Sequence, residues 1–178
     1  MDQEARPVSR SIARMSEIVL PNDTNNLGNL RGGKILHWMD ICAAISAQRH
    51  SSHVCVTASV DNVQFKSPIG QGEVVMIKSH LNRAFRTSME IEISVWAENP
   101  IAGTKRMSNR AFYTFVAIDA GGTPQPVPAL KIESPQEVER YEAAARRREF
   151  RLLLSGRLAD TDADRLANLI REYPTISD

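Results

Sequence analysis

The chain has 178 residues, of which 42% are hydrophobic and 24% are charged, a balance typical of a globular protein with a sizeable core. Its formal net charge of +1 excludes a bulk electrostatic attraction to nucleic acid or to an anionic membrane, so we expect neither as a partner. No stretch of the sequence approaches the roughly 18 apolar residues of a membrane-spanning helix.

Residues 1–10 are polar and lack an apolar segment, which predicts a flexible N-terminal arm without a signal peptide. The two cysteines, Cys42 and Cys55, lie in apolar surroundings without the spacing of a zinc or redox motif. A disulfide or a zinc site therefore has no further support, and two buried free thiols are the better interpretation. Reduced thiols favour a cytoplasmic location, and we expect no metal site.

The first predicted elements are a strand over residues 11–20 and a long helix. Between them, from Pro21 to Gly33, lies a loop dense in turn-forming residues. After Gly33 the apolar residues fall at helical spacing, which predicts a helix that ends near Arg49. One face of this helix is rich in small side chains, namely Ala43, Ala44, Ser46 and Ala47. Small side chains let a helix approach a sheet closely, so we expect the helix to be buried against strands.

Four further strands are predicted at residues 54–60, 74–81, 89–95 and 111–118, from alternating or continuous apolar residues. The alternation of the first of them slips at Asn62, as a β-bulge would produce. Their short connections indicate antiparallel pairing. One helix on one antiparallel sheet is a two-layer α+β unit, and the uncovered face or edge of the sheet predicts a homodimer.

The C-terminal part of the chain has a different pattern. Charged and apolar residues at helical spacing predict a second helix over Pro135–Leu154 and a short third helix over residues 160–172. We interpret residues 131–178 as a helical extension of a domain that spans residues 11–130.

Asp40 is the most informative polar residue of the long helix. Its neighbours at helical spacing include Leu36, Ala43 and Ala44, so its carboxyl group lies beside the apolar stripe. Partial desolvation raises the pKa of a carboxyl group and makes the ionised form a better general base. A structural pair with His37 or with a backbone group explains the same position, and the residues alone leave both explanations open.

The glycine-rich start of the same helix is the second feature. Glycines just before a helix let a substrate come close, and the free N–H groups of the first turn can stabilise an oxyanion. Asn25 and Asn26 add side-chain amides to this loop. A flexible helix-start loop with turn-forming asparagines is the simpler alternative.

Four ordered motifs together resemble the acyl-CoA hydrolase branch of the hotdog thioesterases. They lie at Leu20–Asp40, Val60–Glu73, Arg86–Trp96 and Ala111–Asp119, so that the resemblance covers residues 11–128 and leaves out the C-terminal extension. It implies a hotdog fold, in which an antiparallel sheet wraps around one long central helix.

The resemblance also implies roles for single residues. Asp40 matches the catalytic carboxylate, and Asn25 matches a loop residue that works opposite an Asp of the other subunit. Gly33, beside Gly32, matches the helix-start residue whose N–H faces the thioester oxygen. The residues that match the coenzyme A contacts are Lys66, Ser67, Arg86, Thr87 and Ser88. Phe85 departs from the pattern, since the family usually has Gly at this position.

Several cations could meet the phosphate groups of coenzyme A. Lys66, Arg83 and Arg86 would provide charge-assisted contacts, if they form a cluster. Solvated surface side chains are the alternative for each of them.

The function implied is hydrolysis of an acyl-CoA thioester to a carboxylic acid and CoA. Asp40 would act as general base or as nucleophile, and no cofactor is expected because CoA belongs to the substrate. A homodimer is the expected minimal unit, assembled as a trimer of dimers. Two alternatives remain, namely a non-catalytic acyl-CoA-binding sensor of the same fold and a dehydratase that uses His37.

Overall fold

The computed structural model describes residues 4–61 and 63–155, and it divides the chain into two units, Met1–Glu133 and Ser134–Asp178. The first unit contains β1 (Arg6–Pro7), α1 (Val8–Ser11), β2 (Ala13–Ile18), a short 3-10 turn (Pro21–Asp23), α2 (Gly32–Ser51), β3 (Val54–Val60), β4 (Val74–Ala84), β5 (Ser88–Asn99), β6 (Thr104–Ile118) and β7 (Leu130–Lys131). In the second unit, the described element is α3 (Pro135–Leu154).

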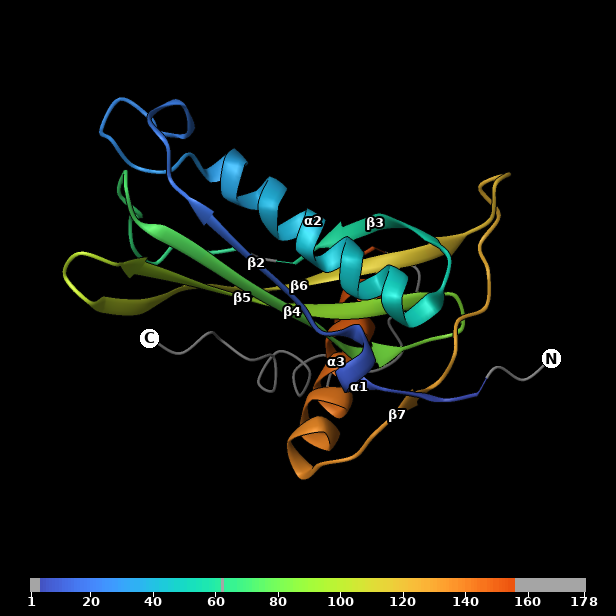
Figure 1. The fold of residues 1–178 in the computed structure, drawn as a ribbon. Coiled ribbons are helices and arrows are strands. Elements are labelled where there is room, and N and C mark those ends of the chain that lie inside the picture. Colours follow the sequence, from blue (N-terminus) through green and yellow to red (C-terminus); the bar gives the residue numbers. More distant parts are fainter. Residues whose placement is uncertain (1–3, 62, 156–178) are drawn as a thin grey trace. The chain divides into compact units, whose positions relative to one another are not determined.

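A five-stranded antiparallel sheet in the order β2-β4-β5-β6-β3 forms the centre of the first unit (Figure 1). The predicted strands are confirmed, and β5 and β6 extend further toward the hairpin between them than the apolar pattern indicated. β3 pairs with β6 and not with β4, so residues 61–73 cross between strands that are not neighbours. A register shift in β3 lies between Thr57 and Ser59, whereas Asn62, where the slip was predicted, lies outside the described residues.

α2 packs across one face of this sheet, as its small residues predicted (Figure 1). The hydroxyl oxygens of Ser46 and Ser79 lie 2.7 Å apart, and the Ser79 hydroxyl donates to the carbonyl oxygen of Cys42 at 2.8 Å. Such short contacts between a helix and a strand need small side chains at the crossing. Cys42 and Cys55 are both free and buried, and burial raises the pKa of both thiols.

The N-terminal segment is part of the fold, in contrast to the flexible arm predicted for residues 1–10. Residues 1–3 lie outside the described residues. β1 pairs in parallel with β7, and the Arg6 guanidinium donates to the carbonyl oxygen of His50 and, at 2.8 Å, to the hydroxyl of Ser52. Polar composition did not reveal this pairing because its partners lie far away along the chain.

α3 begins and ends where the sequence predicted. The Ser134 hydroxyl accepts a hydrogen bond from the backbone N–H of Glu137 at 3.3 Å, and Pro135 occupies the first turn. The third predicted helix, at residues 160–172, lies outside the described residues. None of the described helices is long and apolar enough to cross a membrane.

Candidate active site

The loop before α2 is held in place by ionic and polar contacts. The Asp23 carboxylate accepts the Lys34 ammonium group at 3.0 Å and the backbone N–H of Leu20 at 3.3 Å. The hydrogen bond from Lys34 holds the pKa of Asp23 below its usual value. Arg31 donates to the carbonyl oxygen of Asn22 at 2.6 Å. These contacts fix the direction in which the chain enters α2.

The first turn of α2 presents free N–H groups. Arg31, at the N-cap, provides no side-chain hydrogen bond to the helix. Among the described residues, the backbone N–H groups of Gly32 and Gly33 have no acceptor, whereas Lys34 and Ile35 donate to the carbonyl oxygen of Arg31. Two uncapped donors at a helix N-terminus can stabilise a negatively charged oxygen.

Asn25 faces the same helix start. Its side-chain oxygen accepts hydrogen bonds from the backbone N–H groups of Leu27 at 2.9 Å and of Asn29 at 3.2 Å. This oxygen therefore stabilises the turn. The NH2 group of Asn25 has no hydrogen-bond partner in the part of the chain that the structure describes, and it can donate to a ligand.

A cavity of about 300 Å³ lies beside the N-terminus of α2. It brings together four of the predicted site residues, Asn25, Gly32, Lys66 and Ser67. The other lining residues are Asn29, Leu30, Ile35, Phe65, Pro68, Ile69, Ser108 and Asn109. The ring of Phe65 lies 3.5 Å from the position that a Cβ atom of Gly32 would occupy.

Asp40 is half-buried on α2 and has one strong contact. The Thr57 hydroxyl, on β3, donates to Oδ1 of Asp40 at 2.6 Å. Asp40 therefore pairs with a side chain of the adjacent strand and not with His37. The buried phenol of Tyr113 has a pKa of about 12, because of its burial and because of the negative charge of Asp40.

Sequence reasoning missed Thr57, although a signal was present. The alternation in β3 places Thr57 on the same face of the strand as Cys55, which is buried. A polar residue on that face, opposite a helix that carries a carboxylate, is a candidate partner for the carboxylate.

Asp40 does not line the cavity. It follows Gly33 by seven residues on one helix, and a rise of about 1.5 Å per residue separates the two by about 10 Å along the axis. Within one chain, the Asp40 carboxylate is therefore too far from the free N–H groups of the α2 N-terminus for both to contact one carbonyl group directly.

The remaining predicted coenzyme A contacts lie at the other end of the sheet. β4 starts near the cavity, after Ile69, and its 11 residues span about 33 Å before the hairpin that leads to β5. Arg83, Arg86, Thr87 and Ser88 belong to that distant end. The predicted cluster of Lys66 with Arg83 and Arg86 is therefore not formed within one chain.

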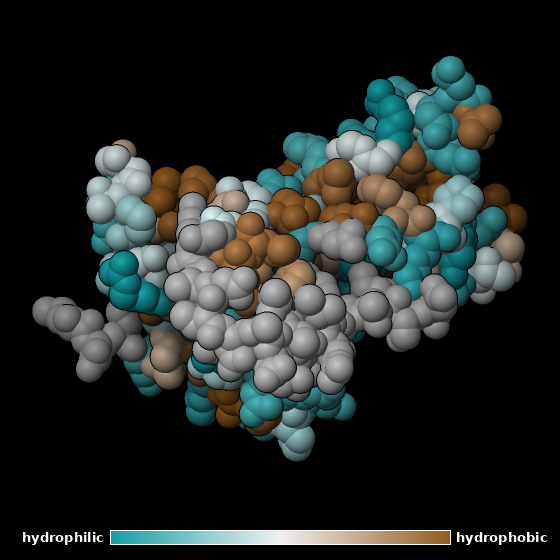
Figure 2. Space-filling view, turned by 180° about the vertical axis from the view of Figure 1, so that it is seen from behind, coloured by the Kyte–Doolittle hydropathy of each residue, from teal (hydrophilic) through white to brown (hydrophobic). Residues whose placement is uncertain are grey.

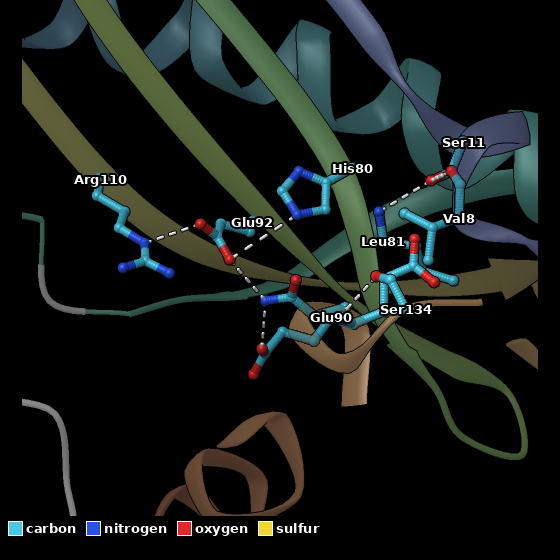
Figure 3. A network of polar contacts seen from close by, with 10 residues as sticks. Val8, Ser11, His80, Leu81, Glu90, Glu92, Arg110 and Ser134 are labelled. Carbon is cyan, nitrogen blue, oxygen red and sulfur yellow. Dashed lines mark hydrogen bonds and ion pairs between the residues drawn. The ribbon is translucent and has the colours of Figure 1, made fainter. Parts of the chain in front are cut away.

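A second polar group lies on the sheet face opposite α2 (Figure 3). Glu92 accepts Nε of Arg110 at 2.8 Å and Nδ2 of Asn82 at 3.1 Å, and Nε2 of His80 lies 3.9 Å away. Burial acts to raise the pKa of Glu92, but the hydrogen bond and the charge of Arg110 outweigh it and leave the pKa lowered. The carboxylate is thus ionised and paired, a structural role that the sequence did not reveal.

Comparison with known proteins decides the family. The family model described as the thioesterase superfamily matches residues 27–103. An uncharacterised acyl-CoA thioester hydrolase of Bacillus subtilis is 40% identical over 129 residues, which cover 72% of this chain and 75% of that protein. The chain belongs to the acyl-CoA thioester hydrolases of the thioesterase superfamily.

Solved thioesterase structures confirm the hotdog fold. A hexameric acyl-CoA thioesterase superposes with a TM-score of 0.82 at 37% identity, and the match covers 86% of this chain and 98% of that one. An acyl-CoA hydrolase of Staphylococcus aureus, solved with butyryl-CoA and CoA, has a TM-score of 0.77 at 30% identity, with 85% and 94% covered. The chain spans only about a quarter of two matching mouse coenzyme A thioesterases, at 34% and 38% identity.

The staphylococcal thioesterase has also been solved as three variants, in which an Asn, an Asp and a Thr are each replaced by alanine. Along that chain the three residues follow one another at intervals of 15 and 17 residues. Asn25, Asp40 and Thr57 lie at the same intervals in this thioesterase.

Proposed function

We propose that the protein hydrolyses acyl-CoA thioesters at a site built from two subunits, with Asp40 as the catalytic carboxylate. The proposal rests on the position of Asp40. Its carboxylate is held by Thr57, and it lies about 10 Å along α2 from the uncapped N-terminus of that helix, too far for both to contact one thioester group within a single chain. Asn25, Asp40 and Thr57 also share the spacing of the three residues replaced in the staphylococcal hydrolase.

A second copy of the chain supplies the missing half of the site in this proposal. β3 is an edge strand, and its exposed residues include Val54, Val56 and Val60, which are 63%, 44% and 48% exposed. Apolar residues are also visible at the surface of the molecule seen from behind (Figure 2). An unpaired edge with exposed valines favours pairing with the same strand of a partner.

Such a two-fold pair would run its α2 helices in opposite directions. Asp40 of the partner subunit would then approach the Gly32–Gly33 N-terminus, and each dimer would hold two equivalent sites. We take this homodimer as the minimal unit, assembled as a trimer of dimers. The hexameric state of the solved thioesterase is consistent with that assembly.

The proposed chemistry uses the ionised carboxylate. Asp40 takes a proton from a water molecule that attacks the thioester carbonyl, or its oxygen attacks the carbonyl carbon directly. The Gly33 N–H, beside that of Gly32, stabilises the tetrahedral oxyanion, and the NH2 group of Asn25 orients the water or the thioester. In the general-base route, collapse of the intermediate breaks the C–S bond, and the CoA thiolate leaves with the proton that Asp40 had taken, so that the carboxylic acid is released. In the direct route, CoA leaves first from a mixed anhydride between Asp40 and the acyl group, and a water molecule then hydrolyses this anhydride to the carboxylic acid and free Asp40.

Coenzyme A itself would contact more than one subunit. Lys66 borders the cavity, whereas Arg83, Arg86, Thr87 and Ser88 lie at the far end of the sheet and would reach the same CoA only from another subunit. The reaction needs no cofactor besides the CoA of its substrate. The two free thiols support a cytoplasmic location.

Replacement of Asp40 tests the proposal. Asp40→Asn keeps the size of the side chain but removes the base, so we expect kcat to fall by about 10²- to 10⁴-fold while inhibition by CoA is retained. Release of CoA is followed with a thiol reagent, and a single turnover in ¹⁸O-labelled water shows whether label enters the Asp40 carboxylate. Substantial activity in Asp40→Asn would contradict this role.

The two alternatives predict other results. A sensor would bind CoA but release no thiol from any acyl-CoA. A dehydratase would convert 3-hydroxyacyl-CoA to an unsaturated product. His37 is exposed and forms no hydrogen bond within the described residues, which gives the dehydratase no structural support.

A further inference from the structure

The inner end of the cavity beside α2 is formed by buried residues. Four of its lining residues are almost fully buried: Ile35 and Ile69 are 2% and 4% exposed, and Ser108 and Asn109 are 1% and 2% exposed. Its outer rim includes the exposed residue Phe65. The CoA arm must continue to a nucleotide outside the protein, so a closed end does not suit it. The acyl chain ends within the site, and a closed end suits it.

The size of the cavity limits what can enter. Its volume of about 300 Å³ lies at the lower end of the usual range of roughly 300–1,000 Å³ for small-molecule pockets. Phe65 closes one side against Gly32, with 3.5 Å between its ring and the position of a Cβ atom there. A short acyl chain fits this space better than a long one.

The lining of the cavity contains one hydroxyl group without a partner. Ser108 donates to the side-chain oxygen of Asn109 at 2.6 Å, and the Asn109 amide donates to the carbonyl oxygen of Gln64, so both residues are satisfied. The hydroxyl oxygen of Ser67 is buried and has no hydrogen-bond partner among the residues that the structure describes. A buried hydroxyl that stays unpaired destabilises a complex, and a purely alkyl occupant would leave it unpaired.

We propose that this cavity is the acyl pocket and that it selects short acyl chains with a hydroxyl or keto oxygen near the thioester. The Ser67 hydroxyl would bind that oxygen, while Leu30, Ile35 and Ile69 contact the carbon chain. The inference rests on the proposed hydrolase function and adds the substrate class to it. Ser67 becomes a specificity-determining residue of the acyl group, in place of the CoA contact that the sequence indicated.

The test compares 3-hydroxybutyryl-CoA with butyryl-CoA, which differ by one hydroxyl group. We expect kcat/KM of the wild-type protein to be about tenfold higher for the hydroxylated substrate, the effect of one hydrogen bond in a closed site. Ser67→Ala should lower kcat/KM for 3-hydroxybutyryl-CoA about tenfold, to the level of butyryl-CoA, so that the preference disappears. Ser16→Ala, on the exposed side of β2, is the matched control and should behave as wild type.

Three results would overturn the assignment. An equal loss on both substrates in Ser67→Ala, together with weaker inhibition by CoA, would place Ser67 on the CoA arm. A wild-type preference for dodecanoyl-CoA over butyryl-CoA would show that the chain enters another space. Equal wild-type rates on the two four-carbon substrates would also contradict the proposal, even if Ser67→Ala does not fold. Release of no thiol from any acyl-CoA would instead overturn the hydrolase function itself.

Discussion

The contact between Thr57 and Asp40 allows a quantitative prediction for the variant Thr57→Val. Valine keeps the shape and β-branching of threonine but removes the O–H group that donates to Oδ1 of Asp40 at 2.6 Å. The fold of β3 should be unaffected, because β-branched residues suit strands. The change therefore isolates one hydrogen bond to the proposed catalytic carboxylate.

A hydrogen bond to a charged group contributes about 1.5–3 kcal/mol, which corresponds to roughly 10- to 150-fold in rate if it acts only in the transition state. Thr57 is exposed, so water can replace part of this contribution and the lower end of the range applies. We expect kcat to fall about tenfold, because the Asp40 carboxylate is no longer held in one orientation.

The assay is steady-state thiol release from butyryl-CoA, with kcat and KM measured separately. Thr57→Ser is the control, since it restores the O–H group and should recover most of kcat. Inhibition by CoA should be the same in all three proteins. The reasoning is refuted if Thr57→Val keeps kcat within about twofold of wild type, or if only KM changes.

Two further predictions concern the helix start and its far end. Gly33→Pro removes one free N–H in the first turn, where proline is tolerated, so kcat should fall by about 10²- to 10³-fold, whereas Gly33→Ala meets no atom within 4 Å and should stay active. His50 is buried and its Nε2 lies 2.9 Å from the carbonyl oxygen of Pro128; burial lowers its pKa below the ordinary 6.5. At low pH the unfolded chain therefore binds more protons than the folded chain. The free energy of unfolding should be highest above about pH 6.5 and should decrease below it. Between about pH 7.5 and pH 5.5, the melting temperature of His50→Gln should fall less than that of the wild-type protein. An equal fall in both proteins would contradict His50 as the origin of the pH dependence.

The sequence predicted the helices and strands whose own residues carry a clear periodic pattern. The apolar spacing after Gly33 predicted α2, and the period-two pattern around Ile91 and Ile93 predicted β5. The charged and apolar residues at helical spacing over Pro135–Leu154 predicted α3. Each of these signals comes from residues within one or two turns or along one strand, where backbone geometry alone determines which side chains share a face.

Local sequence patterns predicted only part of the candidate site. The sequence indicated Asp40, but not that Thr57 holds its carboxylate, because this contact joins a helix to an edge strand. It also suggested a cluster of Lys66 with Arg83 and Arg86, which the length of β4 separates. Contacts between distant residues depend on strand order and register, and local patterns do not contain them.

The amino-acid sequence by itself determined the central helix, the five strands of the main sheet, their order along the chain, and the acidic residue on that helix. The tertiary structure decided which strand lies at the edge, where the cavity closes, and how far Asp40 lies from the free N–H groups. The physical reason is that periodicity acts over a few residues, whereas a pocket forms where segments distant in the chain pack together. The separation of the two halves of the site became visible only once α2 had been placed on its sheet.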